Sequence, residues 1–281
     1  MKICARIADA RLACRELRLG GKRLGLVPTM GALHAGHLSL VRAAKAQCDA
    51  VAVSIFVNPT QFGPAEDFAK YPRPFEADCA ALEKESVNVV FAPAVEEMYA
   101  KRETTWVTVE GLSDKLDGQS RPGHFRGVTT VVAKLFHVIE PDVAFFGQKD
   151  AAQLAVIRRM VRDLKLPVEI VACPIVREAD GLTLSSRNAY LSADERRRAV
   201  VLSRALREVE TAFQAGERDA HALAQRGRAT IAREPRVRLD YFEIVDPDTL
   251  DPVARITANT LVAVAAYVGS TRLIDNVLLE P

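Results

Sequence analysis

The fold is decided by one stretch of the sequence, Leu24-Gly-Leu-Val-Pro-Thr-Met-Gly-Ala-Leu-His-Ala-Gly-His-Leu-Ser-Leu-Val-Arg42. It opens with apolar residues that suit a strand buried on both faces of a parallel sheet, and Pro28 and Gly31 end that strand. Apolar residues then recur at helical spacing, which predicts a helix that begins at Gly36 or His37. The stretch therefore predicts a strand, a turn and a helix.

The predicted turn has the properties of an anion site. In an open α/β sheet, ligands bind beyond the carboxyl ends of the strands, where a helix N-terminus offers N–H groups and a positive dipole end. His34 and His37 are three residues apart, so a first helical turn that includes both places their imidazoles on one face as donors that can become cationic. Gly31 and Gly36 permit close backbone approach, and no nearby cysteine or acidic residue completes a zinc site.

Composition indicates an ordinary globular enzyme-sized chain of 281 residues, with 49% hydrophobic and 26% charged residues. Its net charge of +2 argues against a general binder of nucleic acid or of a membrane surface. The five cysteines form no Cys-x-x-Cys pair, which is typical of reduced thiols in a cytoplasm. The chain start carries scattered charges and no apolar run approaches the roughly 18 residues of a membrane span, so we expect neither export nor membrane insertion.

The order of elements predicts an α/β fold, a Rossmann-like doubly wound parallel sheet with a smaller C-terminal α+β domain. Strands are predicted at residues 24–27, 50–57, 87–93, 142–146 and 168–176, with the second beside the first, and a short one at 106–109. Helices are predicted at 7–17, from 36 or 37 onward, and at 75–85, 128–139 and 151–164, with a loop at 121–127.

The sequence changes character after the last of these strands. Ser192 and Glu195 form a predicted capping box for a charged helix that runs to about residue 215. A helix at 219–233 and strands at 238–245 and 260–268 follow. We therefore divide the chain into a first domain, residues 1–176, and a second, residues 177–281, and expect the two to pack closely.

Three loops that end near residues 37, 150 and 188 are expected to meet above the sheet. Lys149 is a point charge for phosphate, and Asp150 can accept hydrogen bonds from ribose hydroxyls. Ser185, Ser186 and Arg187 can hold and neutralise departing pyrophosphate. Taken alone, each group also fits a plainer interpretation, a solvated Lys-Asp pair or an ordinary turn before a capped helix.

The motifs carry a resemblance. His34-Ala-Gly-His37 after a buried strand, with Ser185-Ser-Arg187 much later, resembles the paired signatures of the cytidylyltransferase and class I aminoacyl-tRNA synthetase superfamily. More closely, residues 22–195 resemble the pantothenate synthetase family through these motifs in order: Pro28-Thr-Met-Gly-Ala-Leu-His-Ala-Gly-His37, Val57-Asn-Pro-Thr-Gln-Phe-Gly63, Tyr71-Pro-Arg73, Phe145-Phe-Gly-Gln-Lys-Asp150, Arg177-Glu-Ala-Asp-Gly181 and Ser185-Ser-Arg-Asn188. Leu184 stands where the family usually has Met, and Gln148 where Glu is common.

The resemblance implies an activity and a set of site residues. The chain would condense (R)-pantoate with β-alanine, using ATP and magnesium and releasing AMP and pyrophosphate through a pantoyl-adenylate. ATP contacts would come from Met30, Gly31, Ala32, Leu33, His34, Ala35, Gly36, His37, Gly147, Gln148, Lys149, Asp150, Val176, Leu184, Ser185, Ser186 and Arg187. The catalytic groups would be His37, His34, Lys149 and Arg187.

The resemblance also assigns the smaller substrates. Gln61 and Gln153 would bind pantoate, and Gln61 would also serve β-alanine. Asn58, Tyr71, Arg121 and His124 would line the site, and Asp78 would contact the magnesium ion, which the ATP phosphates mainly hold. The first domain would bind ATP and pantoate, and the second would act as a lid that excludes water. The family implies a homodimer.

Two other functions remain open. A simple nucleotidylyltransferase uses the same His-x-Gly-His turn but keeps the nucleotide on its product, and a nucleotide-sensing module would bind without turnover. The contexts of Gln61 and Gln153 and the long C-terminal part argue against the first, and the many polar groups argue against the second. AMP release that depends on both pantoate and β-alanine separates all three.

Overall fold

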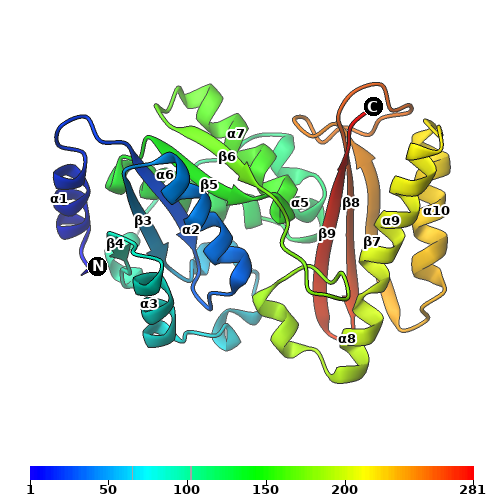
Figure 1. Ribbon diagram of the computed structural model, residues 1–281, viewed down its shortest axis with the longest axis horizontal. Coiled ribbons are helices and arrows are strands. Elements are labelled where there is room, and N and C mark those ends of the chain that lie inside the picture. The colour runs from blue at the N-terminus through cyan, green and yellow to red at the C-terminus, as the bar shows by residue number, and fades with distance from the viewer. Residues whose placement is uncertain (65, 102) are drawn as a thin grey trace. The chain divides into compact units, whose positions relative to one another are not determined.

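The computed structural model describes residues 1–64, 66–101 and 103–281. Its backbone divides into two compact units (Figure 1). The N-terminal unit comprises Met1–Asp114, Arg121–Gly147 and Val156–Cys173, and the C-terminal unit comprises Lys115–Ser120, Gln148–Ala155 and Pro174–Pro281.

A six-stranded parallel sheet forms the centre of the N-terminal unit, in the order β1-β4-β3-β2-β5-β6. The strands are β1 (Lys2–Cys4), β2 (Leu24–Thr29), β3 (Ala50–Ile55), β4 (Val89–Phe91), β5 (Val143–Gly147) and β6 (Glu169–Cys173). The prediction that the strand after residue 50 lies beside the first strand is confirmed, because β2 and β3 pair from Leu24↔Ala50 to Thr29↔Ile55. The order reverses between β2 and β5, so the switch point lies where β2 leads into the histidine turn.

Helices cover both faces of this sheet. Helices α2 (Ala35–Gln47) and α3 (Phe75–Lys84) share one core with alternate residues of β2 and β3, such as Val27 and Val53. Leu26 is fully buried outside that core, on the side where α6 (His124–Ile139) contacts β2 and α1 (Ile7–Leu17) contacts α6. The doubly wound α/β class predicted from the sequence is therefore confirmed. Shorter helices are α4 (Val95–Met98) and α5 (Asp117–Ser120), and α7 (Ala151–Leu164) runs through both units.

The C-terminal unit is an α+β structure, as predicted. Its antiparallel sheet has the order β7-β8-β9, formed by β7 (Val237–Val245), β8 (Thr260–Val268) and β9 (Thr271–Leu279). Helices α9 (Val201–Gln214) and α10 (Ala220–Ala232) pack on one face, where Leu206, Leu223 and Val264 belong to a common core. Figure 1 shows both helices beside the three long strands.

Three expectations about elements need correction, and two strands were not expected. The strand predicted at 106–109 is wrong: Val107 donates its N–H to Thr130 Oγ1 (3.0 Å) and accepts from Thr129 Oγ1 (2.6 Å), so side chains of α6 replace a strand partner. The predicted loop 121–127 is also wrong in its second half, because α6 begins at His124, after Gly123 with φ +83°. The single helix predicted after residue 192 is two, α8 (Ala193–Ala199) and α9, which meet at Val200. Strands β1 and β9 were not predicted.

Three further features concern membrane spans, the cysteines and one helix cap. None of the helices within the described ranges is long and apolar enough to cross a membrane. The cysteines at 4, 14, 48, 79 and 173 are all free thiols. The capping box predicted for Ser192 is confirmed, because its Oγ accepts from Glu195 N at 3.3 Å while Glu195 Oε2 accepts from Ser192 N at 2.9 Å.

Candidate active site

The two histidines of the turn cap helix α2. We call residues 30–37, which include both histidines, the N-terminal turn. His34 is the N-cap, and its Nδ1 accepts a hydrogen bond from Gly36 N at 3.1 Å. His37 Nδ1 accepts in turn from His34 N at 3.3 Å, and the two ring centroids lie 4.1 Å apart. Because both Nδ1 atoms act as acceptors, the network assigns the proton of each neutral ring to Nε2. The turn thus holds two imidazoles side by side, with both Nδ1 atoms turned to the backbone of the turn.

Asp78 of helix α3 holds the backbone just before these histidines. Its Oδ2 accepts from Ala32 N and its Oδ1 from Leu33 N, both at 2.8 Å. The turn needs such support, since Gly31 (φ +79°) and Ala32 (φ +52°) both have left-handed backbone conformations, which are costly for a residue with a Cβ. A Cβ on Gly31 would lie 2.9 Å from Asp78 Oδ2. Burial raises the pKa of Asp78, although the two backbone hydrogen bonds oppose this shift.

Gln61 lies in the 3₁₀ turn Pro59–Gln61, next to the N-terminal turn. Its Oε1 accepts from Asn58 Nδ2 at 3.1 Å, and its Nε2 contacts Met30 Sδ at 3.1 Å. Asn58 is almost fully buried and also donates to Gly127 O at 3.1 Å. A Cβ on Gly127 would come within 2.3 Å of the Thr60 carbonyl oxygen, so glycine is required for this packing. The structure therefore fixes the amide of Gln61 between Asn58 and Met30.

The 3₁₀ turn that carries Gln61 is supported by Arg121, which precedes α6, and by His124, the first residue of α6. Arg121 forms a two-pronged ion pair with Glu66, with Nε–Oε1 and Nη2–Oε2 distances of 2.7 and 2.6 Å. His124 Nδ1 lies 2.8 Å from Gln61 O, which can only accept, so this nitrogen carries the proton. Burial would raise the pKa of Glu66, but the hydrogen bonds and charge of Arg121 lower it below its ordinary value.

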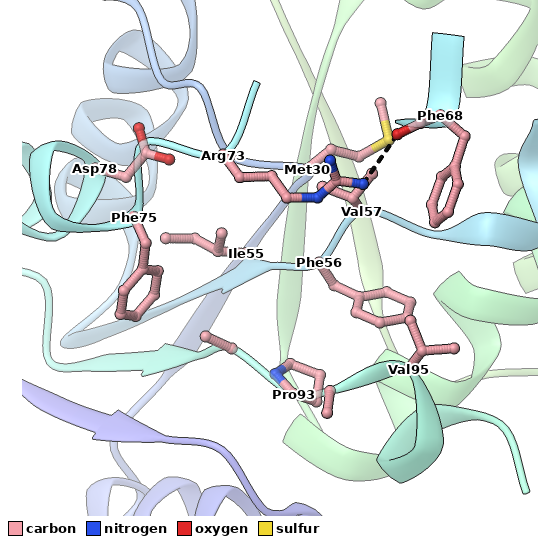
Figure 2. A pocket seen from close by; sticks show the side chains of 13 residues that line it. Met30, Ile55, Phe56, Val57, Phe68, Arg73, Phe75, Asp78, Pro93 and Val95 are labelled. Atoms are coloured by element: carbon pink, nitrogen blue, oxygen red, sulfur yellow. Dashed lines mark hydrogen bonds between the residues drawn. The ribbon is translucent and has the colours of Figure 1, made fainter. Parts of the chain in front are cut away.

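A cavity of about 380 Å³ lies on the α3 side of the N-terminal turn (Figure 2). Among the predicted site residues, Met30, Gly31 and Asp78 line it, and its other walls are mostly apolar. Arg73 reaches across it and donates to Phe68 O and to Tyr71 O, both at 2.9 Å. Tyr71 itself is buried and packs edge-on against Phe62.

In the C-terminal unit, the predicted phosphate-binding residues lie on two loops, which we call the C-terminal loops (residues 148–150 and 185–187). The first is the 3₁₀ turn Gln148–Asp150, where Lys149 Nζ lies 3.4 Å from Asp150 Oδ1. Asn276 of β9 donates to the carbonyl oxygens of Gln148 and Lys149, at 2.9 and 2.8 Å. Gln153 follows on α7 and is half-buried.

The second loop follows a short hairpin that pairs Arg177 with Thr183. Ser185 begins this second loop and is the N-cap of the 3₁₀ turn Ser186–Tyr190. Its Oγ accepts a hydrogen bond from Arg187 N at 3.3 Å. Leu184 N donates to Val176 O at 3.0 Å, which brings these two predicted residues together through the backbone. The structure thus gathers the predicted residues within each unit.

The sequence missed several residues that hold these groups. No recognised motif contains Glu66, Asp275 or Asn276. Arg177 belongs to a motif, Arg177-Glu-Ala-Asp-Gly181, but the motif alone gives it no role. The sequence does contain a signal for Asp275 and Asn276, because they are adjacent polar residues inside an otherwise apolar segment. Within residues 1–64, 66–101 and 103–281, no group of three or more acidic, histidine or cysteine side chains is placed to hold a metal ion. Both carboxylate oxygens of Asp78 are bound to backbone N–H groups.

Comparisons with known proteins agree over the whole chain. The family model of pantoate-beta-alanine ligase matches residues 2–278. A pantothenate synthetase from Acidobacterium capsulatum is 63% identical, over 99% of this chain and 97% of its own. The crystal structure of pantothenate synthetase from Thermus thermophilus has a TM-score of 0.95 at 46% identity, with both chains covered completely. A pantoate-beta-alanine ligase from Francisella tularensis, complexed with beta-gamma ATP and beta-alanine, has a TM-score of 0.82 at 33% identity over 99% of this chain and 97% of that one.

The parallel sheet, its switch point and the histidine-capped turn define the class, an α/β nucleotide-handling fold. Within that class, the family match and the identity of the relatives are decisive. The chain belongs to the pantoate-beta-alanine ligase family, whose members named above are pantothenate synthetases.

Proposed function

We propose that this chain condenses (R)-pantoate with β-alanine at the expense of ATP, giving pantothenate, AMP and pyrophosphate. The observation that carries the proposal is the full-length family match together with the two paired imidazoles of the N-terminal turn. A carboxylate is a poor acyl donor, so pantoate first attacks the α-phosphorus of ATP. This forms a pantoyl-adenylate and releases pyrophosphate.

The first step brings two anions together, and cationic and donor groups must offset their repulsion. We assign His34 and His37 to the triphosphate as neutral Nε2–H donors. Lys149, Ser186 and Arg187 stabilise the charge that develops on pyrophosphate. Gly147, Val176 and the remaining residues named for ATP in the sequence shape the nucleotide pocket. Magnesium would screen the charge of the triphosphate, and we assign it mainly to the phosphate oxygens, because both carboxylate oxygens of Asp78 already accept from backbone N–H groups.

The second step needs a neutral amine and a dry site. Gln61 and Gln153 hold pantoate, and the orientation of the Gln61 amide between Asn58 and Met30 supports this role. Gln61 also serves β-alanine, with Tyr71, Arg121 and His124 nearby in the proposed site. The β-alanine amine attacks the mixed anhydride carbonyl, the C–N bond forms, AMP leaves with the electron pair of the broken C–O bond, and the amine loses a proton.

We also propose a separate role for each of the two domains. Residues 1–176 would bind ATP and pantoate, and residues 177–281 would act as a lid that keeps water from the reactive anhydride. We further propose a homodimer in the cytoplasm, on the grounds of family membership and of free cysteines.

Product analysis of the purified enzyme tests the proposal. With ATP, magnesium and both acids we expect AMP, pyrophosphate and pantothenate in equal amounts. With pantoate but no β-alanine, we expect pyrophosphate release near the enzyme concentration, because the buried adenylate is retained. Pantoate labelled with heavy oxygen in its carboxylate must pass one label into AMP. Label in inorganic phosphate, a nucleotide retained on the product, or binding without turnover would each contradict the proposal.

A further inference from the structure

Strand β9 carries a buried amide side chain, Asn276, that donates hydrogen bonds to the backbone of the first C-terminal loop. Asn276 is only 2% exposed, and its Nδ2 donates to the carbonyl oxygens of two successive residues, Gln148 and Lys149. Its Oδ1 lies 3.5 Å from Gln148 Nε2. One side chain therefore satisfies two backbone acceptors of the first C-terminal loop.

The preceding residue, Asp275, acts on the opposite face of the same strand. Leu273 and Leu279, which share its face, belong to the apolar core under α9. A carboxylate buried there is costly unless it is paired, and Arg177 pairs it through Nη1 and Nη2 at 2.6 and 2.9 Å. The strand thus gains an anchor for a second loop.

Arg177 passes this anchoring to the hairpin that precedes Ser185. Its Nη1 donates to Gly181 O at 3.1 Å and to Thr183 Oγ1 at 2.9 Å. Its Nη2 also approaches the carbonyl oxygen of Asn276 at 3.3 Å. The first C-terminal loop and the hairpin that leads into the second are consequently tied to two adjacent residues of one strand.

We propose that Asn276 and the Asp275–Arg177 pair are positioning residues that align the C-terminal loops for ATP. The inference rests on the ATP contacts proposed for Lys149, Ser186 and Arg187. Asn276 directs two carbonyl oxygens toward β9, so these partial negative charges are held by the protein rather than left for the approach of a triphosphate. Without the amide, the carbonyl oxygens of two half-buried residues lose their donor, and the 3₁₀ turn that carries Lys149 must rearrange to find others.

Substitution of Asn276 by a neutral residue of similar shape tests this role. In Asn276→Leu we expect the dissociation constant for ATP, measured by calorimetry, to rise at least fivefold, with the pantoate constant changed less than twofold. Asn276→Ala, which cannot overpack the site, should show the same split if the larger variant folds poorly. The matched control is Thr260→Val on the neighbouring strand β8, where a buried hydroxyl donates to Ala258 O at 2.8 Å, in a loop without predicted site residues.

The outcomes separate this inference from the proposed function. A loss of ATP affinity in both Asn276 variants, but not in Thr260→Val, supports positioning, because a purely structural loss would not select one substrate. ATP affinity within fivefold of wild type in both variants, or an equal loss in the control, overturns the inference while leaving the activity intact. A wild-type enzyme that binds no ATP would instead refute the proposed function.

Discussion

The N-terminal turn and the first of the C-terminal loops, residues 148–150, are each held by one buried side chain, and the two side chains have opposite hydrogen-bond polarity. Asp78 accepts from two backbone N–H groups, Ala32 and Leu33, whereas Asn276 donates to two carbonyl groups, Gln148 and Lys149. The difference follows from the backbone. A turn with two successive positive φ angles presents N–H groups, and the 3₁₀ turn at the end of β5 presents carbonyl oxygens.

The two solutions also differ in charge. Asp78 places a carboxylate beside a turn that we assign to the ATP triphosphate. Burial raises the pKa of Asp78, because it disfavours the charged form of the carboxyl group. Asn276 carries no titratable group. In this molecule, the one carboxylate that supports the N-terminal turn uses both of its oxygens to accept from backbone N–H groups.

The largest expected effect concerns the N-terminal turn itself. His37→Ala removes the proposed Nε2–H donor and also the acceptor for His34 N, so we expect adenylation to slow by at least about a hundredfold. Single-turnover release of pyrophosphate from ATP and pantoate measures this step. His221→Ala, an exposed change on α10, is the control and should leave the rate unchanged. Near-normal adenylate formation in His37→Ala would remove this histidine from the mechanism.

Asp78→Asn tests the polarity of the N-terminal support. The amide keeps one acceptor but turns its NH2 group against a backbone N–H, and we expect adenylation to fall by about tenfold. A carboxylate whose pKa is raised on folding costs stability at pH above that pKa, so the variant is relieved of this cost and should melt within a few degrees of wild type.

The pH profile distinguishes positioning from packing in this variant. As pH falls through the raised pKa, protonated Asp78 loses one acceptor, so wild-type adenylation should decline at a higher pH than an ordinary aspartate would impose. Asp78→Asn should lack this decline. Glu76→Gln, an exposed change on the same helix, should keep the wild-type profile. A decline that persists unchanged in Asp78→Asn would assign the titration to another group.

The sequence predicted the parallel sheet and the loops because their signals are local. Apolar runs mark β2, β3 and β5, and the His-x-Gly-His motif directly follows one of them. The capping roles of His34 and His37 were not predicted, since histidine is uncommon as a cap and the interaction depends on the orientation of each ring.

The residues that hold the loops could not be found in the same way. Asp78 is 46 residues from Ala32, and Asn276 is 128 from Gln148, so only the tertiary fold brings them together. The polar pair at 275–276 also explains why β9 was missed, because it interrupts the apolar pattern of that strand. The features that hid the strand are those to which we assign a function.

Arg177→Lys tests whether the Asp275–Arg177 pair supports the C-terminal loops, and we expect a smaller effect from it. Lysine keeps the charge beside Asp275 but loses the planar fork that also reaches Gly181 O and Thr183 Oγ1, so ATP affinity should fall by about fivefold. Arg228→Lys, which loosens a more exposed pair with Glu243 elsewhere in this unit, is the control.

The double variant with Asn276→Ala tests whether the two anchors act as one. Additive losses of ATP affinity would show that each loop is held separately, whereas a double variant no worse than one single variant would show a shared role of β9. Arg177→Lys with wild-type ATP affinity would restrict the C-terminal support to Asn276.

The smallest expected effect concerns the Glu66–Arg121 pair beside Gln61. Glu66→Gln removes the charge of a half-buried, two-pronged pair, and we expect a loss of about 1 kcal/mol of unfolding free energy at neutral pH, between the values for exposed pairs and for buried charged hydrogen bonds. The pKa of Glu66 is lowered in the folded state from an ordinary value of 4.5, so this stability is present above pH 4.5 and is lost as pH falls through the lowered pKa.

Denaturant unfolding of wild type and Glu66→Gln across this range gives the measurement. The difference between the two proteins should be constant above about pH 5.5 and should shrink below 4.5, because protonated wild-type Glu66 resembles glutamine. The exposed change Glu96→Gln should show no such dependence. If the difference instead persists undiminished at low pH, the pair contributes by packing alone, and Arg121 is held near Gln61 by His124 and the Gln61 carbonyl rather than by charge.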